Sequence, residues 1–449
     1  WMFFCSLLFR ILSRTRVNSL SQFWVSDDVY VRNGGFDIVV GNPPYVSSSK
    51  IDAVSKEYLC NWSVAKSGKA DLYIPFFQIA LESLKPYGVM GYITVNNFYR
   101  SVNGRELRKY LSRHEFQMKI FDFGAEQVFK GRSTYTCVCI IRNSVGNIAY
   151  TKSNSSELEN EQKTNFLDIA YNGLDDIKGW LLSDEANVID NIKKIESTGT
   201  SLGDFVSIKN GFATLKNDIY VFTPYREDEG YYYLKKNLKV YQIEKAICRS
   251  TVKPNTLDER LPLDLQMEKL IFPYIQNDGK VVLMAEDYLQ TNYPRTYAYL
   301  VDHKKDLAQR DKGNRQYQEW YAYGRTQALN IKGYRLFFPY LASKPIFILS
   351  DEKELMFYNG YALVSDDYEQ LRFLQKILCS KVFWYYIKNS SKPYGGEYMS
   401  LAKNYVKNFG IVNMSPRQRR IFMELTEQKE IDEYLSNLYN LKAAISLYT

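Results

Sequence analysis

The residues Asn42 to Tyr45, Asn-Pro-Pro-Tyr, directly follow a short apolar run from Phe36 to Val40. Such a run is typical of a buried strand, and open α/β sheets hold their ligands at the carboxyl ends of strands. The prolines fix φ and remove two backbone donors, so the adjacent carbonyl groups become rigid acceptors. One such carbonyl and the Asn42 side-chain oxygen together accept both hydrogens of an exocyclic amine, which frees the nitrogen lone pair to attack a methyl group. Tyr45 supplies a flat face on which an extruded base stacks.

A plainer interpretation of the same residues is a strand end followed by a proline turn, with Asn42 as a capping residue. We favour the amine-binding interpretation because asparagine directly before Pro-Pro at the end of an apolar strand is an uncommon combination.

The surrounding sequence predicts a sheet that positions this tetrapeptide. Strands and helices alternate from Phe36 to about Asn143, which implies a parallel-type sheet covered on both faces. Further strands are predicted in residues 89–97, 118–124 and 134–142, and helices in residues 71–88 and 104–114.

The sequence changes in texture after this region. Residues 151–164 are polar and predict a surface connection, and a helix is predicted over residues 185–198. From Ser201 the pattern is of short strands rich in tyrosine and phenylalanine. Two similar stretches, 269–275 and 335–343, each end a strand with Pro-Tyr and are interpreted as strand pairs of one mixed sheet. Residues 369–391 predict one amphipathic helix, and a polar helical tail follows from Ser415.

Composition restricts the class of protein. The chain of 449 residues has 58 Lys and Arg against 50 Asp and Glu, a mild basic excess that favours a polyanionic partner. Its six cysteines are scattered without a Cys-X-X-Cys pair, so we expect no metal site and a reducing, cytoplasmic location.

The apolar stretch of residues 1–16 is too short to span a bilayer. It predicts a buried or partner-facing helix, with a signal peptide as the alternative. His114 and His303 are both expected at the surface, without a role in acid–base chemistry.

With these residues in view, the segment "GGFDIVVGNPPYV" resembles motif IV of the adenine-N6 DNA methyltransferases that use S-adenosylmethionine. The following residues, 69–111, are similar to those of type IIG restriction-modification enzymes and TaqI-like adenine methyltransferases. The resemblance implies that Asn42 and the Pro43 carbonyl accept from the adenine N6, with Pro44 completing the motif. It also implies that Tyr45 stacks on the flipped base and that Phe129 packs against it.

The same resemblance extends to the cofactor and to DNA. Phe76 matches a position that lines the adenine of the cofactor, although core packing explains it equally well. From Ser201 the chain resembles the TaqI-like specificity domain, which implies double-stranded DNA as the partner. Four basic residues are candidates for DNA contact, with solvated surface charge as the alternative for each: Arg132, Arg325, Lys388 and Lys392.

The family's glycine-rich turn, which builds most of the cofactor site, has no counterpart before Phe36: Trp1 to Arg32 contain no glycine. We therefore expect a fragment whose S-adenosylmethionine site is incomplete and which is inactive in methyl transfer as an isolated chain. Its first strand should lie at a sheet edge that a separate or upstream polypeptide completes. The alternative is a truncated remnant in which Trp1 to Leu20 cover the gap.

The predicted fold is α/β: a partial Rossmann-like methyltransferase sheet lacking its N-terminal half, a mixed α+β target-recognition domain and a helical tail. The predicted domains are residues 1–150, 201–414 and 415–449, with a linker and helix over 151–200. The leading function is site-specific adenine-N6 methylation of DNA in a restriction-modification or phage-defence system. The alternatives are a non-catalytic DNA-binding specificity module, or an RNA or protein methyltransferase that shares the motif.

Overall fold

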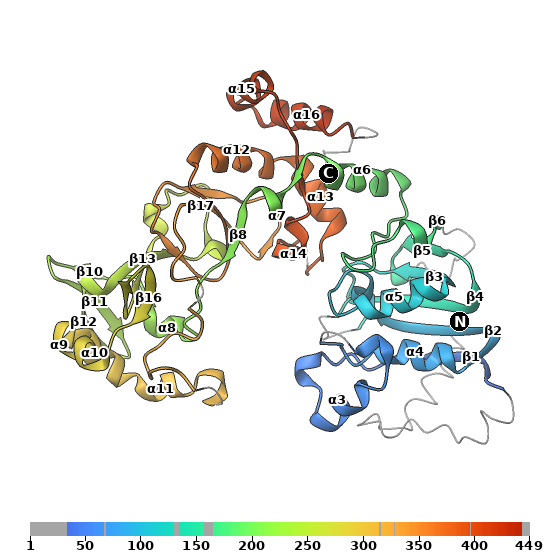
Figure 1. Cartoon of the computed structure of the whole chain (residues 1–449), viewed down its shortest axis with the longest axis horizontal. Coiled ribbons are helices and arrows are strands. Elements are labelled where there is room, and N and C mark those ends of the chain that lie inside the picture. Colours follow the sequence, from blue (N-terminus) through green and yellow to red (C-terminus); the bar gives the residue numbers. More distant parts are fainter. Residues whose placement is uncertain are drawn as a thin grey trace. The chain divides into compact units, whose positions relative to one another are not determined.

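The computed structural model describes residues 34–66, 69–129, 134–156, 165–313, 316–326, 328–395 and 397–441 (Figure 1). The chain forms two compact units. Unit 1 contains Trp1–Lys193 and Asn389–Glu397, and unit 2 contains Lys194–Lys388 and Tyr398–Thr449. The segment 389–397 therefore returns to unit 1 from a distant part of the sequence. The helix predicted in residues 1–16 lies outside the described residues.

Unit 1 is built on a six-stranded sheet, drawn in blue to green in Figure 1. The strands are β1 (Phe36–Gly41), β2 (Leu84–Val95), β3 (Phe116–Asp122), β4 (Thr136–Val145), β5 (Ile148–Lys152) and β6 (Leu167–Ile169). Their order is β1-β2-β4-β3-β5-β6. β1 is parallel to β2 and β3 to β5, whereas β4 is antiparallel to both β2 and β3. The prediction of a parallel-type sheet was thus wrong in part: the sheet is mixed, because β4 turns back from β3 and enters the space beside β2.

Helices α4 (Ile74–Glu82) and α5 (Arg105–His114) pack with one face of this sheet in a single hydrophobic core. Side chains alternate along β2, so that Met90 and Tyr92 are buried in this core while Val89 and Ile93 point to the opposite face. Phe77 of α4 is fully buried and packs on Tyr92 with ring centroids 5.8 Å apart. The remaining elements of unit 1 are α3 (Ala53–Leu59), α6 (Ala186–Ser197, which ends in unit 2) and the 3-10 turns η2 (Ser48–Lys50), η3 (Ser63–Ala65), η4 (Asn96–Tyr99) and η6 (Tyr171–Gly173).

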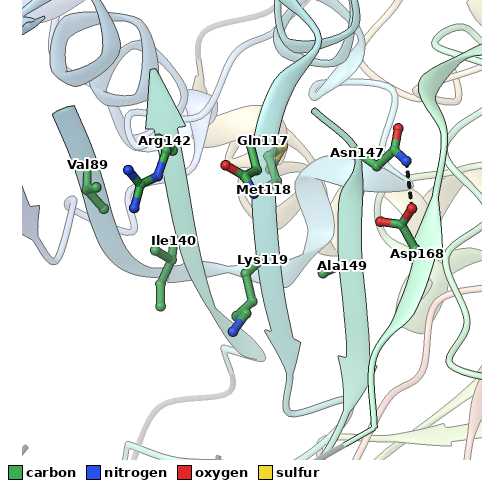
Figure 2. Close-up of a pocket in the computed structure, with 9 residues that line it drawn as sticks. All are labelled: Val89, Gln117, Met118, Lys119, Ile140, Arg142, Asn147, Ala149 and Asp168. Carbon is green, nitrogen blue, oxygen red and sulfur yellow. Dashed lines mark hydrogen bonds between the residues drawn. The ribbon is translucent and has the colours of Figure 1, made fainter. Parts of the chain in front are cut away.

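The opposite face of the sheet carries a hollow of about 560 Å³ over β2 to β6 (Figure 2). It is lined by Val89, Gln117, Met118, Lys119, Ile140, Arg142, Asn147, Ala149 and Asp168. Of these residues, Met118 has its side chain buried in the core on the other face. Further along the same face, Phe121 and Val138 are buried in a smaller cluster with Phe123. Within the described residues, the predicted cover of this second face is therefore only partial.

Strand β1 forms one edge of the sheet as described and pairs with β2 alone. Its side chains Ile38 and Val40 are 60% and 42% exposed, in register with Val89 and Gly91 on the hollowed face. This placement agrees with the expectation of an edge strand that keeps the apolar character of an interior one.

Unit 2 is a set of short strands and helices. One three-stranded sheet contains β10 (Arg226–Glu227), β11 (Tyr231–Lys236) and β12 (Lys239–Glu244). Two four-stranded sheets have the strand orders β20 (Met356–Phe357), β13 (Cys248–Val252), β14 (Glu268–Ile271), β9 (Val221–Phe222) and β19 (Ile348–Ser350), β17 (Tyr334–Phe338), β21 (Tyr361–Ser365), β8 (Ser207–Asn210). Three strand pairs complete the unit: β15 (Tyr274–Asn277) with β16 (Lys280–Leu283), β18 (Leu341–Ala342) with β22 (Met399–Ser400), and β23 (Gly410–Ile411) with β7 (Thr200–Ser201).

The helices of unit 2 are α7 (Leu202–Phe205), α8 (Asn217–Tyr220), α9 (Glu286–Asn292), α10 (Pro294–Asp302), α11 (Lys304–Ala308), α12 (Tyr368–Leu378), α13 (Lys381–Ser390, whose last residues belong to unit 1), α14 (Lys403–Val406), α15 (Pro416–Glu424) and α16 (Gln428–Leu438). The 3-10 turns are η7 (Lys245–Ile247), η8 (Pro254–Thr256), η9 (Asp264–Gln266) and η10 (Arg310–Gly313). No described helix of either unit is both long enough and apolar enough to cross a bilayer.

Two sequence-based predictions in unit 2 were wrong in detail. The similar stretches 269–275 and 335–343 belong to two different four-stranded sheets, because β14 pairs with β13 and β9 whereas β17 pairs with β19 and β21. The helix predicted over residues 369–391 is two helices, α12 and α13. The break lies at Cys379 and Ser380, and the Ser380 hydroxyl accepts from the Phe383 N–H as an N-terminal cap.

The two histidines differ in environment. His114 is exposed as expected and stacks on Phe116. His303 is buried, contrary to expectation, because α10 ends against β12 and the imidazole packs on Tyr241 and Tyr299. The charged neighbours of His303 in sequence gave no sign of this packing.

The turn between β11 and β12 yields a stability prediction. Asn237 and Leu238 have φ values of 51° and 62°, and the Leu238 side chain is fully exposed. The left-handed region disfavours a residue with a Cβ, and hairpin turns of this type prefer Asn-Gly. We expect Leu238→Gly to raise the free energy of unfolding of unit 2 by about 0.5–1 kcal/mol in urea denaturation. Leu265→Gly, at an exposed leucine with negative φ, should not stabilise; equal effects of the two substitutions would contradict the explanation.

Candidate active site

The tetrapeptide lies where the sequence predicted, immediately after the carboxyl end of β1. Asn42 is exposed and Pro43 is buried. Within the described residues the Asn42 amide makes no hydrogen bond, so its oxygen is available to a ligand. Gly41 is required here, since a Cβ at this position would lie 2.9 Å from the Tyr92 ring.

The Tyr45 side chain is held in place by its hydroxyl group, which donates to the Ile93 carbonyl at 3.0 Å. Burial raises the pKa of Tyr45 far above its ordinary value, so the hydroxyl stays protonated. Phe129 lies opposite, with ring centroids 6.3 Å apart and planes inclined by 57°. A base stacked flat on Tyr45 would therefore meet Phe129 obliquely, in the edge-to-face manner that aromatic rings prefer.

A pocket of about 230 Å³ opens beside Tyr45. It is lined by residues from the ends of several elements of unit 1: Tyr45, Val46, Ser47, Asp71, Tyr73, Val95, Asn96, Asn97, Thr134, Tyr135 and Lys392. The loop after the tetrapeptide forms one wall and is fixed twice, because Leu72 N–H donates to the Val46 carbonyl and Ser48 N–H donates to Asp71 Oδ1, both at 2.9 Å.

A buried carboxylate, Asp122, lies next to Asn96 of this wall. Its Oδ1 accepts from Asn96 Nδ2 at 2.8 Å and from the Gly124 N–H at 2.9 Å. Its Oδ2 accepts from the hydroxyl groups of Tyr99 and Tyr150. Burial first, and the Asp122 charge second, raise the pKa of both tyrosines, which keeps them as donors. The four bonds join the turn η4 after β2, the end of β3 and the middle of β5 to one carboxylate.

The described residues do not by themselves fit S-adenosylmethionine. Phe76, the one residue expected beside the cofactor, is only 5% exposed and belongs to the core between α4 and the sheet. Its carbonyl group accepts from the Tyr92 hydroxyl at 3.3 Å, which fixes this part of α4 on β2. The pocket beside Tyr45 does not include Phe76. The described residues also contain no group of three or more His, Cys, Asp or Glu side chains arranged to hold a metal ion.

Comparison with known proteins finds relatives of the part of the chain that carries the tetrapeptide. Residues 12–129 match the family described as Eco57I restriction-modification methylase, and they include the tetrapeptide and Phe129. Over this part the chain is similar to that family, and residues 12–129 are called the methylase segment below. The methylase segment covers most of the site but ends before Thr134, Tyr135 and Lys392 of the pocket.

Relatives extend the similarity beyond the methylase segment. The chain is 28% identical to the Escherichia coli type II restriction enzyme and methyltransferase RM.Eco57I over 66% of this chain and 31% of that protein. It is 24% identical to the type II methyltransferase M.XhoI of Xanthomonas vasicola, over 84% and 68% of the two chains. The chain thus spans about a third of the first relative and two thirds of the second.

Among solved structures, the type IIL restriction-modification enzyme MmeI in complex with DNA has the same fold over 91% of this chain and 55% of its own, with a TM-score of 0.57. At 11% sequence identity this likeness concerns the fold alone. The fold is therefore mixed α/β with a Rossmann-like methyltransferase sheet.

The four candidate DNA contacts fall in different places. Lys392 lines the pocket beside Tyr45. Arg325 is exposed in unit 2, where its N–H donates to the Ala213 carbonyl, and Lys388 is exposed near the end of α13. Arg132 lies outside the described residues. The three described residues remain predicted DNA contacts.

Sequence reasoning missed most of the pocket around the methylase tetrapeptide. Asp71, Asn96 and Tyr135 were unremarkable members of predicted helix and strand segments, and only folding brings them to one wall. The signal that was available is positional: Asn96 follows the strand Leu84–Val95 as Asn42 follows β1, so both amides lie at carboxyl ends of neighbouring parallel strands.

Asp122 provides a test of how this wall is held. Asp122→Asn replaces one accepting oxygen by an amide group that cannot accept from tyrosine hydroxyls. We expect the opening free energy of β2 and β3 to fall by about 2–4 kcal/mol, measured by amide hydrogen exchange. Asp168→Asn is the matched control, because Asp168 makes an exposed bond with Asn147, and its effect should stay below about 0.5 kcal/mol. Similar losses for both variants would show that the buried network is not what holds the wall.

Proposed function

We propose that this chain takes part in site-specific methylation of DNA at adenine N6, in a restriction-modification system. The observation that carries the proposal is the tetrapeptide at the end of β1, with an exposed Asn42 amide, a rigid Pro43 carbonyl and the two rings of Tyr45 and Phe129 beside a pocket. The names of the relatives, type II methyltransferases, support methylation, and the similar structure was solved as a DNA complex.

The chain's residues would act by binding the target base outside the duplex. Tyr45 stacks on the ring, while Asn42 Oδ1 and the Pro43 carbonyl accept the two N6 hydrogens and stabilise the positive charge that develops on nitrogen. No strong general base is needed at this step. When bound, S-adenosylmethionine supplies the electrophilic methyl group.

The cofactor site is proposed to need a second polypeptide segment, separate or upstream, that completes the sheet at β1. The exposed apolar side chains of Ile38 and Val40 and the hollow on the same face support this proposal, because an apolar edge strand is rarely left uncovered. Such a segment would also cover Val89 and Ile140, which line the hollow (Figure 2).

The role of Asn42 is tested in an enzyme reconstituted from this chain and a polypeptide that supplies the cofactor-binding elements. We expect Asn42→Ala to lower the rate of methyl transfer to DNA by roughly 10²–10³-fold, because one of two acceptors at the reacting nitrogen is lost. Asn172→Ala, at an exposed asparagine of η6 that lines neither the hollow nor the pocket, is the matched control and should retain the rate. Methylation that survives Asn42→Ala would exclude the assigned mechanism.

A second candidate function is a DNA-binding specificity module without catalysis. It is favoured by the burial of Phe76 in the core, which leaves this side chain unavailable to a cofactor. Calorimetric titration of this chain with S-adenosylmethionine is expected to give no measurable binding under both proposals. Adding the completing polypeptide should create binding for a methyltransferase and leave none for a pure specificity module. Tight binding by the chain alone would contradict the incomplete site.

DNA as the substrate is tested by salt. A chain that binds duplex DNA phosphates through Arg325 and Lys388 should lose affinity steeply as salt rises. Replacing either residue by methionine should reduce the slope of log K against log salt by about 1. An RNA or protein methyltransferase predicts no such affinity for duplex DNA.

A further inference from the structure

The pocket beside Tyr45 contains one feature that the methylase segment does not account for. Lys392 comes from the segment Asn389–Glu397, which groups with unit 1 although its sequence neighbours on both sides belong to unit 2. The segment is anchored there, since Arg100 Nη1 donates to the Ser391 carbonyl at 2.7 Å and Ser391 is fully buried. The next residue, Lys392, forms part of the pocket wall.

The Lys392 ammonium group can donate hydrogen bonds, and no described carboxylate forms an ion pair with it. Its Nζ lies 5.1 Å from the centre of the Tyr394 ring. Burial lowers the pKa of Lys392, and Asp71 across the pocket acts in the opposite direction. A half-buried ammonium that has lost water and gained no carboxylate gains most from a ligand acceptor.

The charges of the pocket indicate what kind of ligand fits. Among the described residues that line the pocket, Asp71 is the one acid and Lys392 the one base, so their formal charges cancel. A phosphate would lie in the same small space as the Asp71 carboxylate and be repelled. A neutral heteroaromatic ring with acceptor atoms, stacked on Tyr45, matches both the charge and the aromatic wall.

Asn96 cannot supply the missing donor to such a ring. Its two amide hydrogens are already engaged by Asp122 Oδ1 and by the Gly124 carbonyl, at 2.8 and 2.9 Å. Only its oxygen remains, and that oxygen accepts. Among the described lining residues, Lys392 is therefore the charged donor.

We propose that Lys392 donates a hydrogen bond to a ring nitrogen of the extruded target base, so that the segment 389–397 takes part in recognising the base that the tetrapeptide holds. This inference rests on the proposed function. It separates two tasks: Asn42 and Pro43 bind the exocyclic amine, which reacts, and Lys392 binds the ring, which identifies and orients the base.

The test first selects, from a random pool, the duplex sequence that the whole chain binds. Affinity is then measured for that duplex and for versions in which the target adenine is 1-deazaadenine, 3-deazaadenine or 7-deazaadenine, each lacking one ring acceptor. Wild type should lose on the order of tenfold in affinity with one of the three. Lys392→Met should lose about the same factor with adenine, and no more with that deaza base.

Three results would overturn the proposal. The first is that the affinity losses caused by Lys392→Met and by the deaza base multiply for all three analogues. The second is that Lys392→Met loses no affinity at all. The third is that Lys392→Met still loses affinity when the target nucleotide is abasic, which would assign Lys392 to the DNA backbone or to folding. Lys178→Met, at an exposed lysine of unit 1 outside the pocket, is the matched control. If no sequence is enriched, the proposed function itself fails. If a sequence is enriched but Lys392→Met and the deaza base reduce affinity independently, the role of Lys392 is refuted and the proposed function stands.

Discussion

The parallel pairing of β1 with β2 is the constraint on which the site depends. Gly41 faces Tyr92 in this register, and only a residue without a Cβ lets the tyrosine ring lie across the strand end. The Tyr92 hydroxyl then donates to the Phe76 carbonyl of α4. One close approach therefore fixes the strand that carries Asn42, the neighbouring strand and the helix above them. A side chain at position 41 would shift the tetrapeptide relative to its pocket.

A buried charge organises the other side of the pocket. Asp122 has no cation among its described hydrogen-bond partners, so four neutral donors stabilise it. A carboxylate removed from water is costly unless every acceptor site is engaged, and this requirement restricts where Asn96, Tyr99 and Tyr150 can lie. Because Asn96 and Tyr99 lie in the turn η4 after β2 and Tyr150 lies in the middle of β5, the network fixes the turn relative to β3 and β5. Hydrophobic packing alone leaves these positions less defined.

Much of unit 1 could be predicted from its sequence, because its signals are local. The apolar run before Asn42 and the helical periodicity of residues 104–114 each determine an element with little help from the rest of the chain. The motif residues could likewise be placed at a strand end. Sheet direction could not: β4 is as apolar as a parallel interior strand, and its reversal follows from pairing with both β2 and β3.

Features that depend on distant residues were mispredicted or missed. His303 has charged sequence neighbours, yet its environment is set by Tyr241 from another element. The break between α12 and α13 depends on a single hydroxyl cap at Ser380. Lys392 could be selected as a basic residue, but its place beside Tyr45 required Arg100, nearly 300 residues earlier, to fix Ser391.

The edge position of β1 raises the question of how a strand with one neighbour holds a reacting group accurately. The answer lies in the loop after the strand rather than in the strand. Tyr45 is bonded to the Ile93 carbonyl, Val46 to the Leu72 N–H, and Ser48 to Asp71. These bonds attach the loop to β2 and to the residues before α4, on the side of β1 that is already paired. The residues proposed to bind the base are therefore held in place by contacts other than those of Ile38 and Val40. The proposed capture of the base would then not depend on a complete cofactor site.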